Sequence, residues 1–219
     1  MKKLHKIIAA SLLASAASTG SSVVLAESPL TGNIAVASNY IWRGQTQTSD
    51  ASATSGGIDY AHSSGVSAGV WVSNLADESG YEQDIYVGYG GEVGSISYGV
   101  SYTAYQYPIG GGDFSELGLS LGFGPATLNV ASTLDSEDDD SATFSKGDMY
   151  MSIGAEFEIS KGLTLGVLAG SYDYENSGTD YVHTNISLSK DDFSIAWDET
   201  DEDGAKPRLT VSYSKSFDL

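Results

Sequence analysis

Cysteine is absent from the 219 residues of this sequence, which excludes disulfide scaffolds, thiolate nucleophiles and cysteine-ligated zinc or iron–sulfur sites. Basic residues are scarce: Lys and Arg number 10 against 29 Asp and Glu, giving a formal net charge of −19. No basic cluster follows the first six residues, so we expect no nucleic-acid partner. Proline is limited to 4 residues, and a hydrophobic share of 41% argues against a disordered linker. The abundant residues include 26 Gly and 14 Tyr, a composition that favours strands and turns.

Residues 1–26 have the organisation of a secretory signal peptide. Lysines occupy positions 2, 3 and 6, and an apolar run covers 7–13. Val24 and Ala26 place small residues at the −3 and −1 positions of a cleavage site before Glu27. The alternative, a membrane anchor helix, is disfavoured because the run is short and is followed by Ser and Thr. We therefore expect export and a mature domain spanning 27–219. No later stretch approaches the length of a transmembrane helix.

The remaining chain alternates between apolar and polar residues with period two. Leu117, Leu119 and Leu121, for example, alternate with Gly118 and Ser120. Period two places successive side chains on opposite faces of a strand. The pattern predicts an all-β chain with about twelve strands. The expected strands are 33–42, 54–62, 66–75, 82–90, 95–107, 114–122, 126–134, 148–159, 163–174, 180–189, 193–199 and 207–219.

The connections between these strands alternate in length. Five are short turns, and the longer ones cover 43–53, 76–81, 108–113, 135–147, 175–179 and 200–206. Outer-membrane barrels have this asymmetry, with short periplasmic turns and longer outer loops. We predict a transmembrane antiparallel up-and-down β-barrel, with both termini in the periplasm.

The composition of the two strand faces favours a membrane barrel over a soluble sandwich. The polar face is mostly Gly, Ser, Thr and Ala with few Lys, whereas soluble surfaces are rich in charge of both signs. Small side chains suit the inside of a narrow tube, and an apolar exterior suits lipid. Aromatic residues gather near strand ends, as in the girdles at membrane interfaces. The expected girdle residues are Tyr40, Trp42, Tyr89, Tyr98, Phe123, Phe157, Trp197 and Phe217.

Several blocks resemble a known family. The opening segment 32–44, the blocks 56–60 and 67–74, and the ending 211–217 are similar to motifs of the TorF-type porins of proteobacteria. The resemblance implies an outer-membrane β-barrel that acts as a porin. One departure is that Phe217 is followed by two further residues, whereas such barrels commonly end on an aromatic residue.

Candidates for catalysis or metal binding are few. After residue 26 the histidines are His62 and His183, and a histidine-based catalytic site would also need a nucleophile and an orienting partner within hydrogen-bond reach. We expect no enzymatic activity and no cofactor; a lipid-modifying enzyme is a distant alternative. Asp138, Asp139 and Asp140 are weak candidates for binding a divalent cation, but a solvated acidic rim explains this cluster more simply.

Charged residues on the polar face would decide selectivity. The residues expected to line the pore are Arg43, Asp59, Asp84, Glu116, Glu156, Glu158 and Arg208. Segment 33–43 and Asp59 either form the pore wall or only support barrel closure. Trp71 faces the lumen under strict alternation, whereas a bulge would turn it to lipid.

Two functions follow from this pattern. The leading hypothesis is a porin-like channel for passive diffusion of small hydrophilic solutes, leaning to cations. The alternative is a closed barrel with a structural or surface-interaction role, blocked by side chains or by loop 135–147. The expected partners are outer-membrane lipids, the barrel-assembly machinery, and small solutes or ions.

Overall fold

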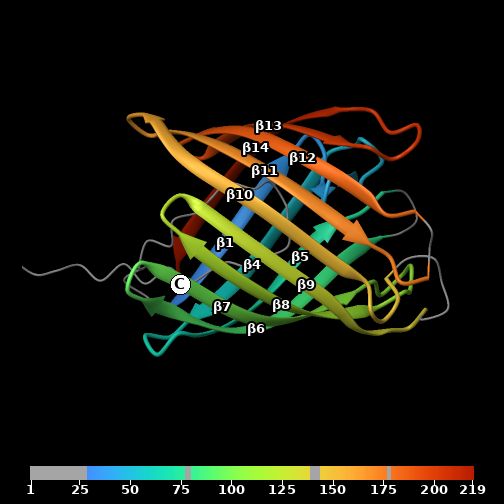
Figure 1. The fold of residues 1–219 in the computed structure, drawn as a ribbon, viewed down its shortest axis with the longest axis horizontal. Coiled ribbons are helices and arrows are strands. Elements are labelled where there is room, and N and C mark those ends of the chain that lie inside the picture. Colours follow the sequence, from blue (N-terminus) through green and yellow to red (C-terminus); the bar gives the residue numbers. More distant parts are fainter. Residues whose placement is uncertain (1–28, 77–79, 139–143, 177–178) are drawn as a thin grey trace, which may run out of the picture.

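A computed structural model describes residues 29–76, 80–138, 144–176 and 179–219. Twelve antiparallel strands form a closed barrel in the order β1-β14-β13-β12-β11-β10-β9-β8-β7-β6-β5-β4 (Figure 1). The barrel strands are β1 (Leu30–Ala37), β4 (Ala53–Ala61), β5 (Val66–Asn74), β6 (Tyr81–Val93), β7 (Ile96–Gln106), β8 (Phe114–Phe123), β9 (Ala126–Ser136), β10 (Met149–Ser160), β11 (Leu163–Asp173), β12 (Tyr181–Lys190), β13 (Phe193–Thr200) and β14 (Arg208–Asp218). The predicted fold class is confirmed.

Closure joins the first and last strands. Thr31 on β1 pairs with Asp218 on β14, and on its other side β1 pairs with β4. The barrel sheet has no open edge, so each of its strands can satisfy its backbone groups within the sheet. In the described part of the chain, no helix is long and apolar enough to cross a membrane.

The two ends of the barrel differ as the sequence predicted. Turns such as 124–125 and 161–162 are short, whereas connections such as 38–52 and 107–113 at the opposite end are longer. We call these the short-turn end and the long-loop end. The start of β1 and the end of β14 both lie at the short-turn end (Figure 1).

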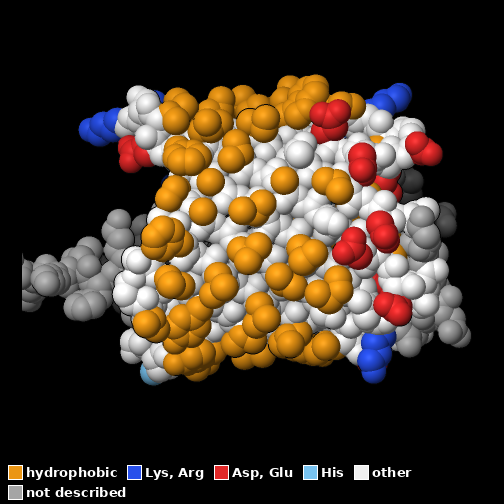
Figure 2. Space-filling view, viewed as in Figure 1, with side chains coloured by type: hydrophobic (Ala, Val, Ile, Leu, Met, Phe, Trp, Pro, Cys, Tyr) orange, Lys and Arg blue, Asp and Glu red, His pale blue; other side chains and the backbone are white. Residues whose placement is uncertain are grey.

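The outer face of the barrel is apolar over most of its height. Leu119 and Ile153 are 51% and 61% exposed, while their strand neighbours Ser120 and Ser152 are buried. Figure 2 shows hydrophobic side chains covering the outer wall and acidic side chains gathering toward the long-loop end. This distribution inverts that of a soluble barrel, because the exposed face is the apolar one.

The first predicted strand is wrong at its C-terminal end. β1 ends at Ala37, and the connection 38–52 turns into the lumen over residues 39–48; we call the connection the inward loop. It contains a small hairpin of β2 (Ile41–Trp42) and β3 (Gln45–Thr46). Tyr40 and Trp42 are only 2% and 4% exposed, so they are not girdle residues. Their apolar rings find an equally apolar environment inside the barrel, which the alternating pattern cannot distinguish from lipid.

Candidate functional site in the barrel lumen

The inward loop is held in its fold by its own polar side chains. The Asn39 amide oxygen accepts hydrogen bonds from the hydroxyls of Thr46 and Thr48 at 2.6 Å and 3.0 Å. The Thr48 hydroxyl oxygen also accepts from the Tyr40 backbone N–H at 3.1 Å. These bonds satisfy buried backbone and side-chain groups that would otherwise be costly inside the barrel. The loop is therefore an ordered constriction.

An ion pair fixes the tip of the inward loop to the barrel wall. The Arg43 guanidinium donates to both carboxylate oxygens of Glu116 on β8, at 2.8 Å and 2.6 Å. Its carbon lies 4.2 Å from the ring centroids of both Trp42 and Tyr150, so the cation is sandwiched between aromatic faces. Tyr105 donates a further hydrogen bond to Glu116 at 3.2 Å. Arg43 and Glu116 thus both reach the lumen, but as a paired unit.

An aromatic cluster surrounds this ion pair and fills the long-loop half of the lumen. The Trp42 ring centroid lies 6.1 Å from that of Tyr105 and 6.0 Å from that of Tyr172. Phe114 and Phe144 stack at 4.4 Å, so the described end of the 135–147 connection also contributes. Tyr40 packs edge-on against Trp71 at 5.5 Å, which places Trp71 inward as strict alternation predicted.

Two carboxylates on β6 face the same region. Glu82 and Asp84 are only 2% and 1% exposed, and the Tyr40 hydroxyl donates to Glu82 at 3.2 Å. Asp84 is on the inner face, as predicted, beside Glu82 on the same strand. Glu82 is a lumen residue that the sequence did not lead us to predict. Its position two residues before Asp84, on the same face of the same strand, was the available signal.

The lumen residues predicted toward the short-turn end are more exposed than those beside the inward loop. Glu156 and Glu158 are exposed and alternate with the outward-facing Phe157 on β10. Asp59 on β4 accepts a hydrogen bond from the Asn33 amide at 2.8 Å and another from the Tyr86 hydroxyl. Asp59 therefore faces the lumen and is held by neighbouring strands.

The last predicted lumen residue, Arg208, lies at the long-loop rim. Its guanidinium donates to Asp50 of the inward loop at 2.7 Å. This hydrogen bond lowers the pKa of the Asp50 carboxyl from its ordinary value, against a smaller opposing effect of burial. Arg208 thus ties the outer end of the inward loop to β14.

The weak metal candidates gain no support. Asp138 is described, whereas Asp139 and Asp140 lie outside the described residues. Within the described ranges, no group of three or more acidic or histidine side chains is arranged to hold a metal ion.

The other expected girdle residues lie on the outer face of the barrel. Tyr89 and Phe123 are 47% and 64% exposed, and Trp197 is 45% exposed. Tyr89 contacts Tyr98 on the neighbouring strand at a ring distance of 6.4 Å. The exposed aromatic side chains toward the short-turn end include the predicted girdle residues Tyr89, Phe123, Phe157 and Phe217.

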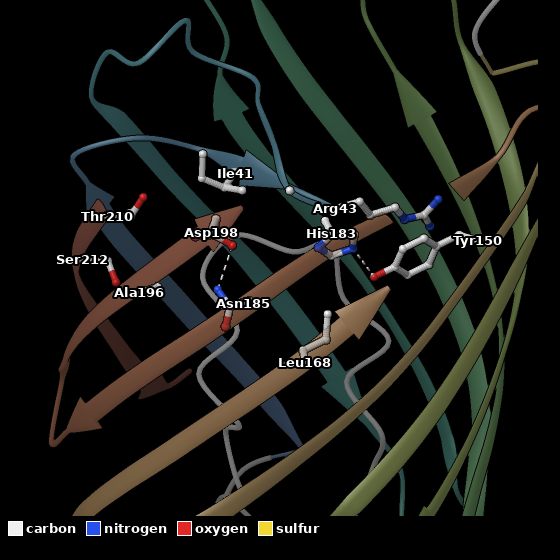
Figure 3. Close-up of a pocket in the computed structure, with 11 residues that line it drawn as sticks. Ile41, Arg43, Tyr150, Leu168, His183, Asn185, Ala196, Asp198, Thr210 and Ser212 are labelled. Atoms are coloured by element: carbon white, nitrogen blue, oxygen red, sulfur yellow. Dashed lines mark hydrogen bonds between the residues drawn. The ribbon is translucent and has the colours of Figure 1, made fainter. Parts of the chain in front are cut away.

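The inward loop leaves a cavity on one side. Its lining comes from the loop tip and from β10, β11, β12, β13 and β14 (Figure 3). His183 belongs to this lining and contacts the Tyr150 hydroxyl at 3.0 Å through Nε2. The sequence singled out His183 only as a catalytic candidate; no described nucleophile makes a hydrogen bond to it besides this tyrosine.

A closed twelve-stranded barrel with an apolar exterior and a polar, constricted lumen has the architecture of an outer-membrane porin. The chain belongs to the family described as bacterial protein of unknown function (Gcw_chp), which matches residues 24–217. No curated protein matches the sequence.

Solved structures support the same fold. The barrel is similar to KdgM porin, with a TM-score of 0.59 and 8% identity over 86% of this chain and 99% of that one. It is also similar to KdgM porin in complex with disordered oligogalacturonate, with a TM-score of 0.57 and 7% identity over 87% and 98% of the two chains. Identities this low establish the shared fold alone.

Proposed function

We propose that this protein is an outer-membrane channel through which small hydrophilic solutes diffuse passively, with a preference for cations. The observation that carries the proposal is the pairing of an apolar outer face with a polar, acidic lumen in a closed barrel. A sheet exposed to lipid must close into a barrel to pair its backbone groups, and a water-filled interior requires polar side chains along its wall. The inward loop supplies the constriction at which solutes are selected.

The charges facing the lumen favour cations. Inward carboxylates outnumber inward guanidinium groups, and negative walls in a narrow pore raise the local concentration of cations. The inward acidic residues include Asp59, Glu82, Asp84, Glu116, Glu156, Glu158 and Asp198, against Arg43 and Arg208.

Location and orientation are part of the same proposal. A signal peptide ending before Glu27 would export the chain, and the barrel-assembly machinery would insert it with both termini periplasmic. The opening motif supports a relationship to TorF-type porins. We assign no enzymatic role.

Planar-bilayer recording tests the channel function. Purified protein should produce discrete conductance steps that are absent from protein-free bilayers, and a salt gradient should give a reversal potential of cation-selective sign. Absence of steps from protein with an intact fold, checked by circular dichroism, would exclude an open channel.

One observation favours a second function, a closed barrel with a structural or surface-interaction role. The cluster of Trp42, Phe114 and Tyr172 fills much of the long-loop half of the lumen. A variant with residues 39–48 replaced by a short Gly-Ser linker separates the two functions. Conductance only in this variant would indicate that the native barrel is closed; conductance in both, larger in the variant, would indicate a constricted open pore.

A further inference from the structure

The cavity beside the inward loop has a lining of mixed character. The loop makes its ring contacts and its buried ion pair with β5, β7, β8, β10 and β11. A cavity of about 70 Å³ remains toward β12, β13 and β14. In Figure 3, Asn185, Asp198, Thr210 and Ser212 come from these three strands, and Ile41 approaches from the loop.

The polar groups in this cavity are held in place but incompletely paired. Asn185 donates to Asp198 Oδ1 at 2.8 Å, which orients both side chains. His183 Nδ1 and Thr210 Oγ1 are buried and have no hydrogen-bond partner among the described residues. Buried polar atoms are nearly always satisfied in folded proteins, so these two atoms in one cavity are available to hydrogen-bond a ligand that enters it.

The lining selects the class of ligand. Hydroxyl groups of Thr210 and Ser212 both donate and accept, the Asp198 carboxylate only accepts, and a neutral imidazole does one or the other at Nδ1. Alcohol groups complement all of these at once. Ile41 and Leu168 provide apolar surface for a short carbon chain.

The charges near the cavity disfavour ionic ligands. Asp198 disfavours an anion, and the nearby Arg43 is committed to Glu116 by two hydrogen bonds. A simple cation would satisfy Asp198 but would give no partner that accepts from a hydroxyl donor.

We propose that this cavity is a binding site for a small neutral polyol of three or four carbons, located where the inward loop narrows the lumen. The site rests on the proposed function insofar as the polyol would be a solute on the diffusion path. Gly44 positions the site, because its left-handed backbone (φ 85°) brings the loop tip against His183.

Binding of erythritol to the folded full-length barrel in detergent micelles tests the site. Calorimetric or saturation-transfer titration should show saturable binding. Thr210→Val should weaken it by roughly three- to tenfold, the loss expected for one hydrogen bond. Asp198→Asn should also weaken erythritol binding. Ser212→Ala replaces Thr210→Val as the test variant if Thr210→Val does not fold.

Thr133→Val is the matched control. Thr133 is as buried as Thr210 and its hydroxyl is likewise without a described partner, but it lies on β9 and does not line the cavity. Erythritol affinity unchanged in the Thr210, Ser212 and Asp198 variants, or reduced equally in Thr133→Val, would overturn the site. Tighter binding of ethanolammonium or acetate than of erythritol would overturn the ligand class.

Bilayer recording separates this inference from the channel function. Conductance without erythritol binding would remove the site and leave the channel. Erythritol binding without conductance would remove the channel and leave a polyol-binding closed barrel. If both hold, erythritol should reduce the ion current, and Thr210→Val should shift that block to higher concentration by the same factor as binding.

Discussion

Arg43 and Glu116 join the inward loop to the barrel wall across 73 residues of sequence, through a bidentate ion pair that is sealed from solvent. Two charges taken out of water are stable only when each satisfies the other. The pair is therefore the feature on which the position of the inward loop depends.

Removing one partner should destabilise the barrel strongly. Glu116→Gln leaves the Arg43 guanidinium buried without a counter-charge, and we expect a loss of about 3–5 kcal/mol in the free energy of unfolding. Glu92→Gln is the matched control: the same substitution at an exposed position on β6 should change stability by less than about 0.5 kcal/mol. Urea unfolding followed by tryptophan fluorescence measures both. Similar values for the two variants would contradict the role of the ion pair.

The turn at the loop tip should not tolerate a side chain. Gly44 and Gly94 both have positive φ, at 85° and 66°, so an alanine at either is strained by about 1–2 kcal/mol. A Cβ on Gly44 would in addition lie 2.6 Å from His183 Cβ, whereas a Cβ on Gly94 meets nothing within 4 Å. Gly44→Ala should therefore be the more destabilising, with a change in the near-ultraviolet circular dichroism of the aromatic cluster. Equal effects would mean that His183 does not support the turn.

The outer face should reject charge. Leu119 is exposed at mid-strand on β8, so Leu119→Arg should cost about 2–4 kcal/mol in lipid vesicles if it lies near the bilayer midplane. Thr127 faces the lumen and is exposed to it, so Thr127→Arg should cost less than about 1 kcal/mol. A larger cost at Thr127 would invert the assignment of the two faces.

Ion selectivity should follow the lumen carboxylates. Replacing Glu156 and Glu158 together by Gln should move the reversal potential in a salt gradient toward zero. The shift should be larger at low salt, because a charge acts over a Debye length of about 10 Å at 0.1 M but only about 3 Å at 1 M. Asp192→Asn is the control, because Asp192 lies in a turn and is paired with Lys215 at 2.7 Å. An anion-selective native channel would refute the charge argument.

Glu116 should behave differently from those two residues. Neutralising it exposes the charge of Arg43, so Glu116→Gln should shift selectivity toward anions by more than Glu156→Gln does. A smaller shift would indicate that permeating ions do not pass close to Arg43.

The rim contact between Asp50 and Arg208 should make a small, pH-dependent contribution to stability. The pKa of the Asp50 carboxyl is lower in the folded protein than in the unfolded chain, chiefly because of the hydrogen bond from Arg208. The stabilisation is therefore complete above the unfolded pKa of about 4 and is lost as pH falls through the lower folded value. The difference between native protein and Asp50→Asn should be at most about 1 kcal/mol near neutral pH and should shrink below about pH 4. Unfolding midpoints across this range measure it, and a difference that grows on acidification would contradict the sign.

Alternation of apolar and polar residues determined most of the barrel. The strand now seen at Phe114–Phe123 was predicted at 114–122, and that at Leu163–Asp173 at 163–174. These strands can be predicted from the sequence because lipid contacts every outward side chain and the lumen contacts every inward one. The requirement for apolar or polar side chains therefore alternates every two residues within each strand.

Only the tertiary structure shows that the inward loop, 38–52, turns into the lumen. Tyr40 and Trp42 continue the alternation of β1 and look like girdle residues, yet Arg43 between aromatic rings can be buried only where Glu116 meets it. Glu116 lies on β8, 73 residues away, and no residue pattern within the loop predicts this pairing. Sequence therefore determined which face of each strand meets lipid, whereas the pairing of distant charges and rings decided how the lumen is filled, because an apolar ring is equally satisfied by lipid or by a protein interior.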